Sequence, residues 1–416
     1  MKILWITNLL LPKAAESIGQ PTSNGGGWLQ SSAKALLKTF PSLQLAIATV
    51  SPYVEILTIK IVDEVTYYIL PLKGDIAKYN KELEQLWQKV YDDFNPILVH
   101  LHGTEYAHGL AYLKANSSSQ VVVSIQGLVS VISNYYNEGL SFRDILKNIT
   151  FRDVVRLDSL WNQKKKFCKR GCYEVQILQN VKYVIGRTSW DKSHVWAINP
   201  EIKYYSCEET LRDGFYINTW NYYSCEHYSI FVSQATYPVK GLHQLLKAMP
   251  LILSHYPNAK IYVAGSDVTK YETLGDKIRI SGYGKYIKRM IDNLGLNDKV
   301  FFTGSLSEKQ MIDRYLRSNV FVCPSSIENS PNSLGEAQIL GVPCVASYVG
   351  GIPDMMKGNE ENLYRFEEVE MLAEKVCKIF SNKDKHKNMI EEATRRHNPE
   401  TNSNRLFEIY KSIIEK

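Results

Sequence analysis

The sequence predicts two α/β domains, each with a doubly wound parallel sheet, that face each other across a cleft. The chain has 416 residues, and at roughly 100–200 residues per domain this length suggests two or three domains. Short apolar segments of strand length alternate with amphipathic segments of helix length, which is typical of parallel sheets covered on both faces. One such series of alternating segments lies in each half of the chain, so two domains of this kind are expected.

In the first half, the opening strand leads through the glycine-rich stretch 24–27 into a helix. The predicted strands are 2–7, 45–50, 53–60, 65–70, 97–101, 121–125 and 181–185. The predicted helices are 28–39, 81–93, 105–115, longer helical material over 141–180, and a helix from about residue 189.

The second half repeats this order. Its predicted strands are 229–233, 260–264, 300–303, 320–323 and 344–347, and its predicted helices are 241–254, 284–294, 307–317, 333–340 and 400–414. We therefore expect an N-terminal Rossmann-like domain over 1–215, a linker over 216–228, a C-terminal Rossmann-like domain over 229–396 and a final segment over 397–416.

The net charge of +6 is concentrated in one window. Residues 143–170 contain nine Lys or Arg and three Asp. A basic patch can hold an anionic surface or a phosphorylated substrate, and a solvated helix face is the simpler reading. Our hypothesis is that this window docks on an anionic membrane.

The sequence does not favour a metal site, a disulfide framework or a membrane span. Cys168 and Cys172 are four residues apart, without a histidine cluster that would complete a zinc site. No apolar run reaches the roughly 18 residues that cross a bilayer. The first strand begins at Lys2, so we expect no signal peptide and a cytoplasmic location, at most peripheral on the inner face of the cell membrane.

Two carboxylates stand eight residues apart after the predicted strand 320–323. Glu328 lies in a polar loop and Glu336 near the start of the next helix. Asn332 or Ser333 would cap that helix, and Ser333 with Glu336 is typical of a capping box. Free amides at a helix start bind diphosphates, and carboxylates accept paired hydrogen bonds from vicinal hydroxyls. A lone Glu in a first turn can simply stabilise the helix end, but two Glu around this loop favour a ligand site.

Two further segments follow strands. Lys240-Gly241 precedes a helix, where a lysine can meet a phosphate together with the helix amides; an exposed loop lysine is the alternative. Gly26 and Gly27 follow the first strand and would let the backbone approach a ligand. The glycines are consecutive, so they are not a dinucleotide fingerprint.

Three polar residues stand at other strand ends of the first half. His102, Gln126 and Arg187 each follow a predicted strand, and carboxyl ends of parallel strands face the ligand crevice. A buried, hydrogen-bonded histidine is the alternative for His102.

Several of these segments resemble a known family. They are the N-terminal glycine loop after the first strand, Lys240-Gly241, the strand 261–265, Phe302-Thr-Gly304, the two-Glu run 328–337, and the segments 341–347 and 349–354. With them the chain resembles, over nearly its full length, the retaining GT-B glycosyltransferases of glycosyltransferase family 4 (glycosyl transferases group 1).

The resemblance implies a nucleotide-sugar donor, UDP- or GDP-linked, bound mainly by the C-terminal domain, and an acceptor-side N-terminal domain onto which the last helix crosses back. Lys240 resembles the pyrophosphate lysine, Glu328 the glutamate that meets the sugar hydroxyls, and Glu336 the one that binds the ribose. The full predicted set is Lys240, Glu328 and Gln126 for catalysis; Gly26, Gly27, Arg187, Lys240, Gly265, Gly304, Glu328, Asn332, Ser333, Leu334 and Glu336 for the donor; and His102 and Gln126 for the acceptor.

Two departures from the family are visible. No Arg stands a few residues before Lys240, so Arg187 or Arg212 would have to supply a second positive charge. Gln126 stands where the family commonly has His. A glutamine can hydrogen-bond a hydroxyl, but it cannot take up a proton at pH 7 and so cannot act as a general acid or base. The sequence contains no Asp-x-Asp pair, which favours catalysis without a metal and without a further cofactor.

The predicted function is a retaining transfer of a sugar from a nucleoside-diphosphate sugar to a glycan or lipid-linked acceptor in cell-surface polysaccharide synthesis, with no nucleic-acid partner. A sugar-nucleotide epimerase of the same fold would share the donor but use no acceptor. A phosphorolytic enzyme with pyridoxal phosphate would need a Schiff-base lysine and usually a longer chain. A catalytically inactive glycan-binding subunit is the alternative outside enzymes.

Overall fold

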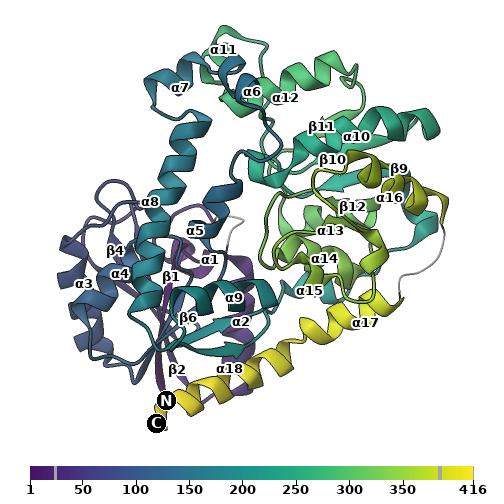
Figure 1. The fold of residues 1–416 in the computed structure, drawn as a ribbon. Helices are drawn as coiled ribbons and strands as arrows, with labels where there is room; N and C mark the ends of the chain where they lie inside the picture. The colour runs from purple at the N-terminus through teal and green to yellow at the C-terminus, as the bar shows by residue number, and fades with distance from the viewer. Residues whose placement is uncertain (23–25, 383–386, 416) are drawn as a thin grey trace. The chain divides into compact units, whose positions relative to one another are not determined.

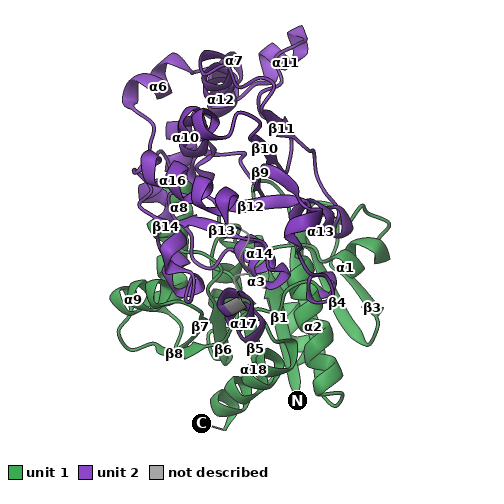
Figure 2. Cartoon of the chain, turned by 90° about the vertical axis from the view of Figure 1, so that its right-hand side faces the viewer, with its two compact units in different colours: residues 1–131, 167–212, 396–416 green, residues 132–166, 213–395 purple. Residues whose placement is uncertain are grey.

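The computed structural model describes residues 1–22, 26–382 and 387–415. The chain forms two compact units (Figure 2). Unit 1 contains residues 1–131, 167–212 and 396–416, and unit 2 contains residues 132–166 and 213–395. Part of the predicted glycine-rich stretch 24–27 lies outside the described residues, which include only Gly26 and Gly27 of it.

The sheet of unit 1 has the strand order β3-β4-β2-β1-β5-β6-β7-β8. Neighbouring strands run parallel, apart from β3, which is antiparallel to β4. The strands are β1 (Lys2–Thr7), β2 (Gln44–Ser51), β3 (Thr58–Val62), β4 (Val65–Pro71), β5 (Leu98–His102), β6 (Val121–Ser124), β7 (Tyr183–Gly186) and β8 (Lys203–Ser206).

Helices cover both faces of this sheet (Figure 1). Successive side chains of a strand point to opposite faces, and Leu4 and Ile6 pack with α3 and α4, whereas Ile3 and Trp5 pack with α2 and α18. The helices are α1 (Pro12–Ser17), α2 (Gly27–Thr39), α3 (Glu82–Phe94), α4 (His108–Ala115), α5 (Val129–Ile132), α8 (Leu160–Gln179), α9 (Ser189–Ile198) and α18 (Pro399–Ile414), with α5 and α8 continuing across the unit boundary along the chain.

The sheet of unit 2 is parallel, with the order β11-β10-β9-β12-β13-β14. Its strands are β9 (Glu226–Val232), β10 (Lys260–Val263), β11 (Val300–Phe302), β12 (Ser318–Cys323), β13 (Cys344–Ser347) and β14 (Leu363–Tyr364). Its helices are α6 (Phe142–Lys147), α7 (Phe151–Val155), α10 (Leu242–His255), α11 (Leu274–Arg279), α12 (Gly282–Asn293), α13 (Glu308–Leu316), α14 (Asn332–Leu340), α15 (Ile352–Met355), α16 (Val369–Ser381) and α17 (Lys387–Arg396), and short 3-10 turns are η1 (Ser133–Tyr135), η2 (Asp213–Tyr216), η3 (Tyr222–Ser224), η4 (Pro238–Lys240) and η5 (Glu360–Asn362).

The unit boundaries differ from the predicted domains in the basic window. Residues 132–166, expected in the N-terminal domain, pack with unit 2. The Ser326 hydroxyl donates to the Tyr135 carbonyl at 3.1 Å, and the Lys285 ammonium donates to the Ile149 carbonyl at 3.4 Å. These contacts join segments far apart in the sequence, so a local pattern could not reveal them.

The segment 216–228, expected as a linker, also packs with unit 2. Trp220 is buried, its backbone N–H donates to the Leu340 carbonyl at 2.7 Å, and its indole N–H donates to the Ser318 carbonyl at 2.7 Å. A buried indole with a satisfied N–H is a packing anchor. The last helix, α18, belongs to unit 1. None of the described helices is long and apolar enough to cross a bilayer.

Candidate active site

The site of unit 2 is built from loops that follow neighbouring strands. β9 pairs with β12, and β12 pairs with β13. Because these strands are parallel, the loops at their carboxyl ends lie along one edge of the sheet, where such sheets bind ligands. This edge receives Lys240 from the loop after β9 and Ser325 to Glu328 from the loop after β12.

Lys240 and Glu328 form an ion pair. The Lys240 ammonium lies 2.6 Å from Glu328 Oε1, and the Ser325 hydroxyl donates to the same oxygen at 2.8 Å. The two charged side chains are only 19% and 15% exposed. Burial by itself lowers the pKa of the Lys240 ammonium, but the attraction of Glu328 outweighs burial and the pKa of Lys240 is raised. Lys240 therefore stays cationic.

Gly241 allows the two loops to touch. Its φ of 69° is in the left-handed region, and a Cβ at this position would lie 1.7 Å from the Pro324 carbonyl oxygen. A backbone bond from the Ser326 N–H to the Val239 carbonyl, 2.8 Å long, ties the loops together. Only glycine fits this close approach, and the contact places Lys240 beside the Glu328 loop.

The Glu328 backbone is held from the other side by the turn after β13. The Gly351 N–H donates to the Glu328 carbonyl at 3.0 Å, and a Cβ on Gly350 would lie 1.9 Å from the same oxygen. The Ser347 hydroxyl donates to the Ser325 carbonyl at 2.6 Å. The loop is therefore fixed on two sides before any ligand binds, as a preorganised site requires.

The start of α14 differs from the predicted capping box. The N-cap is Pro331, without a side-chain cap, so the helix begins two residues earlier than a Ser333 cap requires. Glu336 therefore lies in the second turn, where its side chain is buried, with 6% of the residue exposed. The Leu334 N–H donates to the Pro331 carbonyl at 2.9 Å, so this amide already has a partner.

Two groups at the start of α14 remain suited to a ligand. Asn332 and Ser333 occupy the first two helical positions, whose amides have no carbonyl partner inside a helix. The Asn332 side-chain oxygen is buried and has no hydrogen-bond partner within the described part of the chain. A buried polar atom of this kind calls for an explanation, and a hydroxyl or N–H of a bound molecule would supply one.

Gly265 and Gly304 extend the same edge. They follow β10 and β11, and the Gly265 N–H donates to the Gly304 carbonyl at 2.9 Å. Both have positive φ, 102° and 76°, and a Cβ on either glycine would meet no atom within 4 Å. The backbone beside these glycines is therefore open.

The remaining predicted residues belong to unit 1. Gly26 is the N-cap of α2 with φ 79°. A Cβ on Gly27 would lie 3.1 Å from Cδ of Arg212, so the stem of this arginine lies against the glycine stretch. His102, Gln126 and Arg187 stand at the carboxyl ends of β5, β6 and β7. The structure thus brings Arg212, rather than Arg187, to the glycines.

Arg187 is already committed to other groups. Its guanidinium pairs with Glu209 and donates to the carbonyls of Ile125 and Gln126, the latter at 3.4 Å. Burial opposes the charge, but Glu209 and Asp191 outweigh it and raise the pKa of Arg187. The side chain is 4% exposed, so it joins strand ends of unit 1, and binding a phosphate would require it to leave these partners.

His102 is buried without a hydrogen bond. Its ring centroid lies 3.7 Å from that of His100 and 4.5 Å from that of Trp5, and neither ring nitrogen has a partner among the residues described. Burial, followed by the nearby charges of His100 and Arg187, holds the pKa of His102 well below its usual range. The ring is therefore neutral near pH 7.

A small cavity adjoins these groups. It measures about 30 Å³, room for one or two water molecules at most, and its lining includes Trp28, His102, Gln126, Arg187 and Glu208. A larger hollow of about 690 Å³, lined in part by Gln120 and Asn180, lies at the amino ends of β6 and β7. That end of a parallel sheet is not where such folds bind ligands.

Part of the second unit matches a known family. Residues 221–396 match the family model described as glycosyl transferases group 1, and we call this stretch the group 1 domain after that match. The chain is also 34% identical, over 128 residues, to an uncharacterized glycosyltransferase of Methanocaldococcus jannaschii, a match that covers 31% of this chain and 29% of that protein. The match spans less than a third of the length of this relative.

Solved structures share the fold of the whole chain. A sucrose-phosphate synthase from Thermosynechococcus elongatus superposes with a TM-score of 0.71 at 16% identity, covering 100% of this chain and 99% of that chain. An Anabaena protein in complex with UDP and glucose gives a TM-score of 0.66 at 14% identity, covering 99% and 100%. The predicted GT-B fold of two Rossmann-like domains, with the group 1 domain as the second, is confirmed.

Sequence reasoning missed two residues of unit 1, outside the group 1 domain. Asn8 follows β1 and donates to Glu105 Oε2 at 2.5 Å, and a Cβ on Gly103 would lie 2.2 Å from that oxygen and 3.2 Å from Cγ of Gln126. Burial, together with the charge of Glu174, raises the pKa of Glu105 to about 7. Asn8 and Glu105 each stand just past a strand, which is the signal that could have found them.

Proposed function

We propose that the chain transfers a sugar from a nucleoside-diphosphate sugar to an acceptor hydroxyl, with retention of configuration and without a metal ion. The observation that carries this proposal is the Lys240–Glu328 pair beside the start of α14, inside the group 1 domain. The Anabaena structure of the same fold holds UDP and glucose, which supports UDP as the first nucleotide to test.

The leaving group is a nucleoside diphosphate, whose negative charge grows as the glycosidic bond breaks. Lys240 and the amides of Asn332 and Ser333 would stabilise that charge, since fixed dipoles and cations act strongly where water is excluded. Glu328 and Glu336 would accept hydrogen bonds from hydroxyls of the sugar and the ribose.

Retention fits the protonation states of the candidate residues. In the proposed step, the acceptor oxygen attacks the anomeric carbon on the face that the diphosphate leaves, and a phosphate oxygen takes the acceptor's proton. This step needs no base at His102 or at Gln126, whose amide cannot accept a proton near pH 7. The absence of an Asp-x-Asp pair from the sequence is the reason for proposing that the diphosphate is held without a metal.

The acceptor and setting are further parts of the proposal. We place the reaction in cell-surface polysaccharide synthesis at the cytoplasmic side of a membrane, with a glycan or lipid-linked acceptor. The basic window 143–170 supports this setting, because its charge suits anionic lipid.

The test measures nucleoside-diphosphate release from UDP- and GDP-sugars with glycan and lipid-linked acceptors. Lys240→Ala and Glu336→Ala should each reduce transfer by roughly a hundredfold or more, as loss of a charge-stabilising group does. Lys378→Ala on the exposed side of α16 is the matched control and should retain full activity. Full activity in both site variants contradicts the site assignment.

Two outcomes distinguish the alternative functions, and two others test the mechanism. Conversion of the donor sugar to its epimer without an acceptor indicates an epimerase, and glycan binding without any turnover indicates an inactive subunit. Product with inverted anomeric configuration, determined by NMR, contradicts retention. Activity that EDTA abolishes and Mg²⁺ or Mn²⁺ restores contradicts the metal-free mechanism.

A further inference from the structure

Two short helices of the basic window and one neighbour expose apolar side chains together. In both ribbon views, α6, α7 and α11 lie at one end of unit 2 (Figures 1 and 2), and α11 packs against α7. Six exposed apolar residues of these segments, 63% to 80% accessible, are named the apolar tip: Phe142, Phe151, Val154, Val155, Leu157 and Leu274. Large exposed apolar side chains gathered at one end of a unit mark interaction surfaces.

The order of residues in α7 shows that the exposure is not a loose end. Phe151, Val154 and Val155 stand at positions i, i+3 and i+4, which share one helix face. The helix begins with a capping box, in which the Asp153 N–H donates to the Thr150 hydroxyl and the Thr150 N–H donates to the Asp153 carboxylate. The N-terminus of α7 is therefore stabilised by its capping box, and the apolar face of the helix is exposed.

Leu157 occupies a position that normally takes glycine. It follows the end of α7 with φ 49°, in the left-handed region. The Asp158 N–H donates to the Asp153 carbonyl at 3.0 Å and the Leu157 N–H to the Val154 carbonyl at 3.4 Å, the two bonds of a Schellman motif. A leucine strains this backbone, and its side chain is 69% exposed, so the fold itself gains nothing from it.

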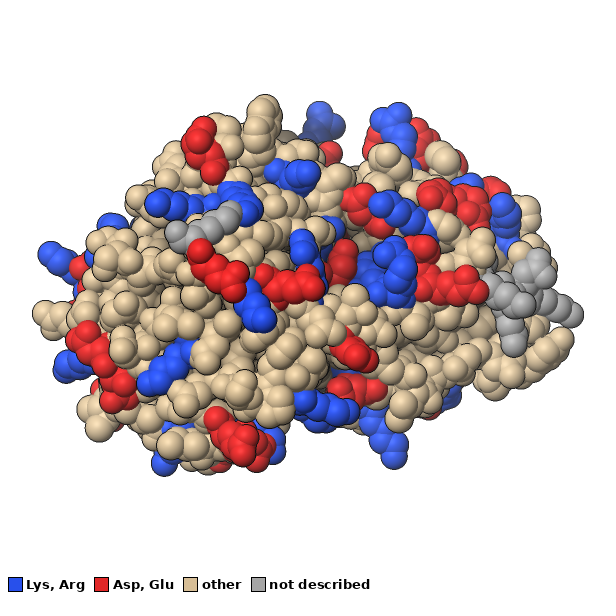
Figure 3. Space-filling view, turned by 90° about the horizontal axis from the view of Figure 1, so that it is seen from below, with Lys and Arg blue, Asp and Glu red and all other residues tan. Residues whose placement is uncertain are grey.

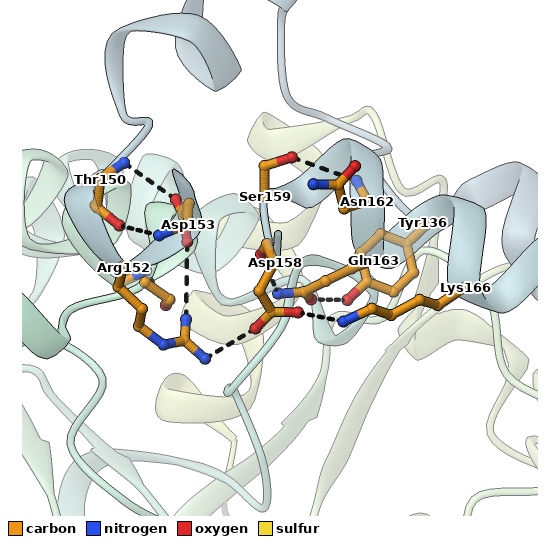
Figure 4. A network of polar contacts seen from close by, with 11 residues as sticks. Tyr136, Thr150, Arg152, Asp153, Asp158, Ser159, Asn162, Gln163 and Lys166 are labelled. Atoms are coloured by element: carbon orange, nitrogen blue, oxygen red, sulfur yellow. Dashed lines mark hydrogen bonds and ion pairs between the residues drawn. The ribbon is translucent and has the colours of Figure 1, made fainter. Parts of the chain in front are cut away.

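A polar network holds the tip on α8 (Figure 4). The Asp158 carboxylate accepts from Arg152 at 2.9 Å and from Lys166 at 3.0 Å, and the Gln163 amide donates to the Asp158 carbonyl at 3.0 Å. Tyr136 donates to the Gln163 side chain. The turn after α7, which carries Leu157, is therefore held in place on α8 by ion pairs and hydrogen bonds.

A second attachment joins the segment to α12. The Arg289 guanidinium donates to the Asn148 side-chain oxygen at 3.3 Å. A Cβ on Gly282 would lie 2.7 Å from the Asp153 carboxylate and 3.1 Å from the Asn148 carbonyl. The glycine thus permits close packing, and the tip stays at a defined place on unit 2.

The charges around the tip are unbalanced. Residues 141–166 contain seven basic residues and three acidic ones. All three carboxylates have internal partners: Asp144 accepts from Ser141, Asp153 from the Thr150 N–H, and Asp158 from Arg152 and Lys166. Among the described residues no ion pair is formed by four exposed cations, which are Arg143, Lys147, Arg156 and Lys165. The molecular face in Figure 3, by contrast, mixes both signs.

We propose that the apolar tip inserts into the interface of an anionic membrane while these four cations contact lipid phosphates. Apolar residues beside unpaired Lys and Arg are the composition of interfacial anchors, and each cation near an anionic surface adds to the attraction. The inference rests on the proposed function only in its purpose, which is to bring the group 1 domain to a lipid-linked acceptor.

The same charge argues against a second copy of the chain as the occupant. A twofold contact places one patch against itself, so the four unpaired cations of one copy would face those of the other. Like charges brought together in this way oppose association. An anionic lipid surface satisfies both the apolar side chains and the cations.

The experiment is co-sedimentation of the full chain with vesicles, without sugar nucleotide. Vesicles containing phosphatidylglycerol should bind the chain, and vesicles of phosphatidylcholine alone should bind far less. Phe142→Ser with Phe151→Ser should weaken binding by roughly tenfold or more, given the apolar area removed. Arg143→Ala with Arg156→Ala should weaken it similarly and reduce its salt dependence.

Two further variants keep the result interpretable if the first pair folds poorly. Leu157→Gly preserves the Schellman motif and should weaken vesicle binding severalfold with an unchanged circular dichroism spectrum. Tyr223→Ser, which removes an exposed aromatic residue of unit 2 outside the tip, should bind like the wild type.

Three results would overturn the proposal. They are no binding to phosphatidylglycerol vesicles at low salt, equal binding to both vesicle types, or a wild-type dimer that Phe151→Ser dissociates. Lys240→Ala, which disables transfer under the proposed function, should bind vesicles like the wild type. Failure of the membrane proposal can therefore be told apart from failure of the proposed transfer.

Discussion

Replacing Glu328 by Gln tests the electrostatics of the donor site most directly. The change keeps the shape of the side chain and removes the counter-charge 2.6 Å from the Lys240 ammonium. Removing one partner of a fully buried pair costs about 3–5 kcal/mol. Because these side chains retain 19% and 15% exposure, solvent screens part of that effect, and we expect a loss of about 2 kcal/mol. For a unit of this size the loss corresponds to roughly 4–8 °C in Tm.

A nucleoside diphosphate should restore what the variant loses. In the wild type the phosphates must draw the Lys240 ammonium away from Glu328, whereas in Glu328→Gln the ammonium has no competing carboxylate. UDP should therefore raise the Tm of the variant more than that of the wild type, equivalent to binding up to about 30-fold tighter for 2 kcal/mol. A UDP-sugar should gain less over UDP in the variant, because one acceptor for its hydroxyls has changed.

Thermal unfolding followed by fluorescence, with UDP and UDP-sugars at fixed concentrations, measures both effects. Glu374→Gln is the matched control, since Glu374 pairs with Lys375 at 3.4 Å on α16 and is 60% exposed. That variant should unfold and respond to UDP like the wild type. If Glu328→Gln also keeps the wild-type Tm and the wild-type response to UDP, the pair neither stabilises unit 2 nor competes with phosphate, and the site reasoning fails.

Three other perturbations follow from single contacts. Gly241→Ala should destabilise the chain well beyond the roughly 1 kcal/mol of left-handed strain expected for Gly295→Ala, because only at 241 does the new Cβ meet backbone, 1.7 Å from the Pro324 oxygen; urea unfolding compares them. Leu157→Gly should raise the free energy of unfolding by about 1 kcal/mol, since it relieves the same strain, and an unchanged or lower value in urea contradicts this account. Ionising Glu105 lowers stability as pH rises from 4.5 to about 7, so Glu105→Gln should exceed the wild type by up to roughly 3 kcal/mol at pH 8 and match it near pH 4. Equal wild-type and variant stability at pH 8 would rule that out.

The sheets were predictable because buried parallel strands leave a local signal. A strand covered on both faces is largely apolar, and β13, at Cys344–Ser347, has the bounds predicted from its apolar residues. β14, of two residues, and the edge strand β8, in which only Tyr205 is buried, leave almost no such signal. The placement of 132–166 on unit 2 depends on contacts between distant segments, which no periodicity encodes.

The residues of the site also divide into those that a local sequence pattern predicts and those that it does not. The meeting of Lys240 and Glu328 was predictable because both follow neighbouring parallel strands, at the edge where such sheets bind ligands. The predicted capping box is wrong because Pro331, with its fixed φ, is the N-cap of α14, two residues before Ser333, and its carbonyl accepts from the Leu334 N–H. Arg187 was read as an available cation because its partner Glu209 is 22 residues away and belongs to no motif.

The two units also differ in how they handle charge, and this bears on the proposed chemistry. The edge of unit 2 keeps a cation, Lys240, with a carboxylate that a phosphate can displace. The strand ends of unit 1 hold a neutral His102, an Arg187 that is paired with Glu209, and Gln126, whose amide is neither an acid nor a base near pH 7. A mechanism that required a base at these strand ends could draw on Glu105 or on Glu208, which lines the same cavity as His102, and burial raises the pKa of each carboxyl to about 7. The proposed reaction, in which the leaving phosphate takes the acceptor proton, makes no demand on these carboxylates, so Glu105→Gln and Glu208→Gln should leave transfer intact if that proposal is right.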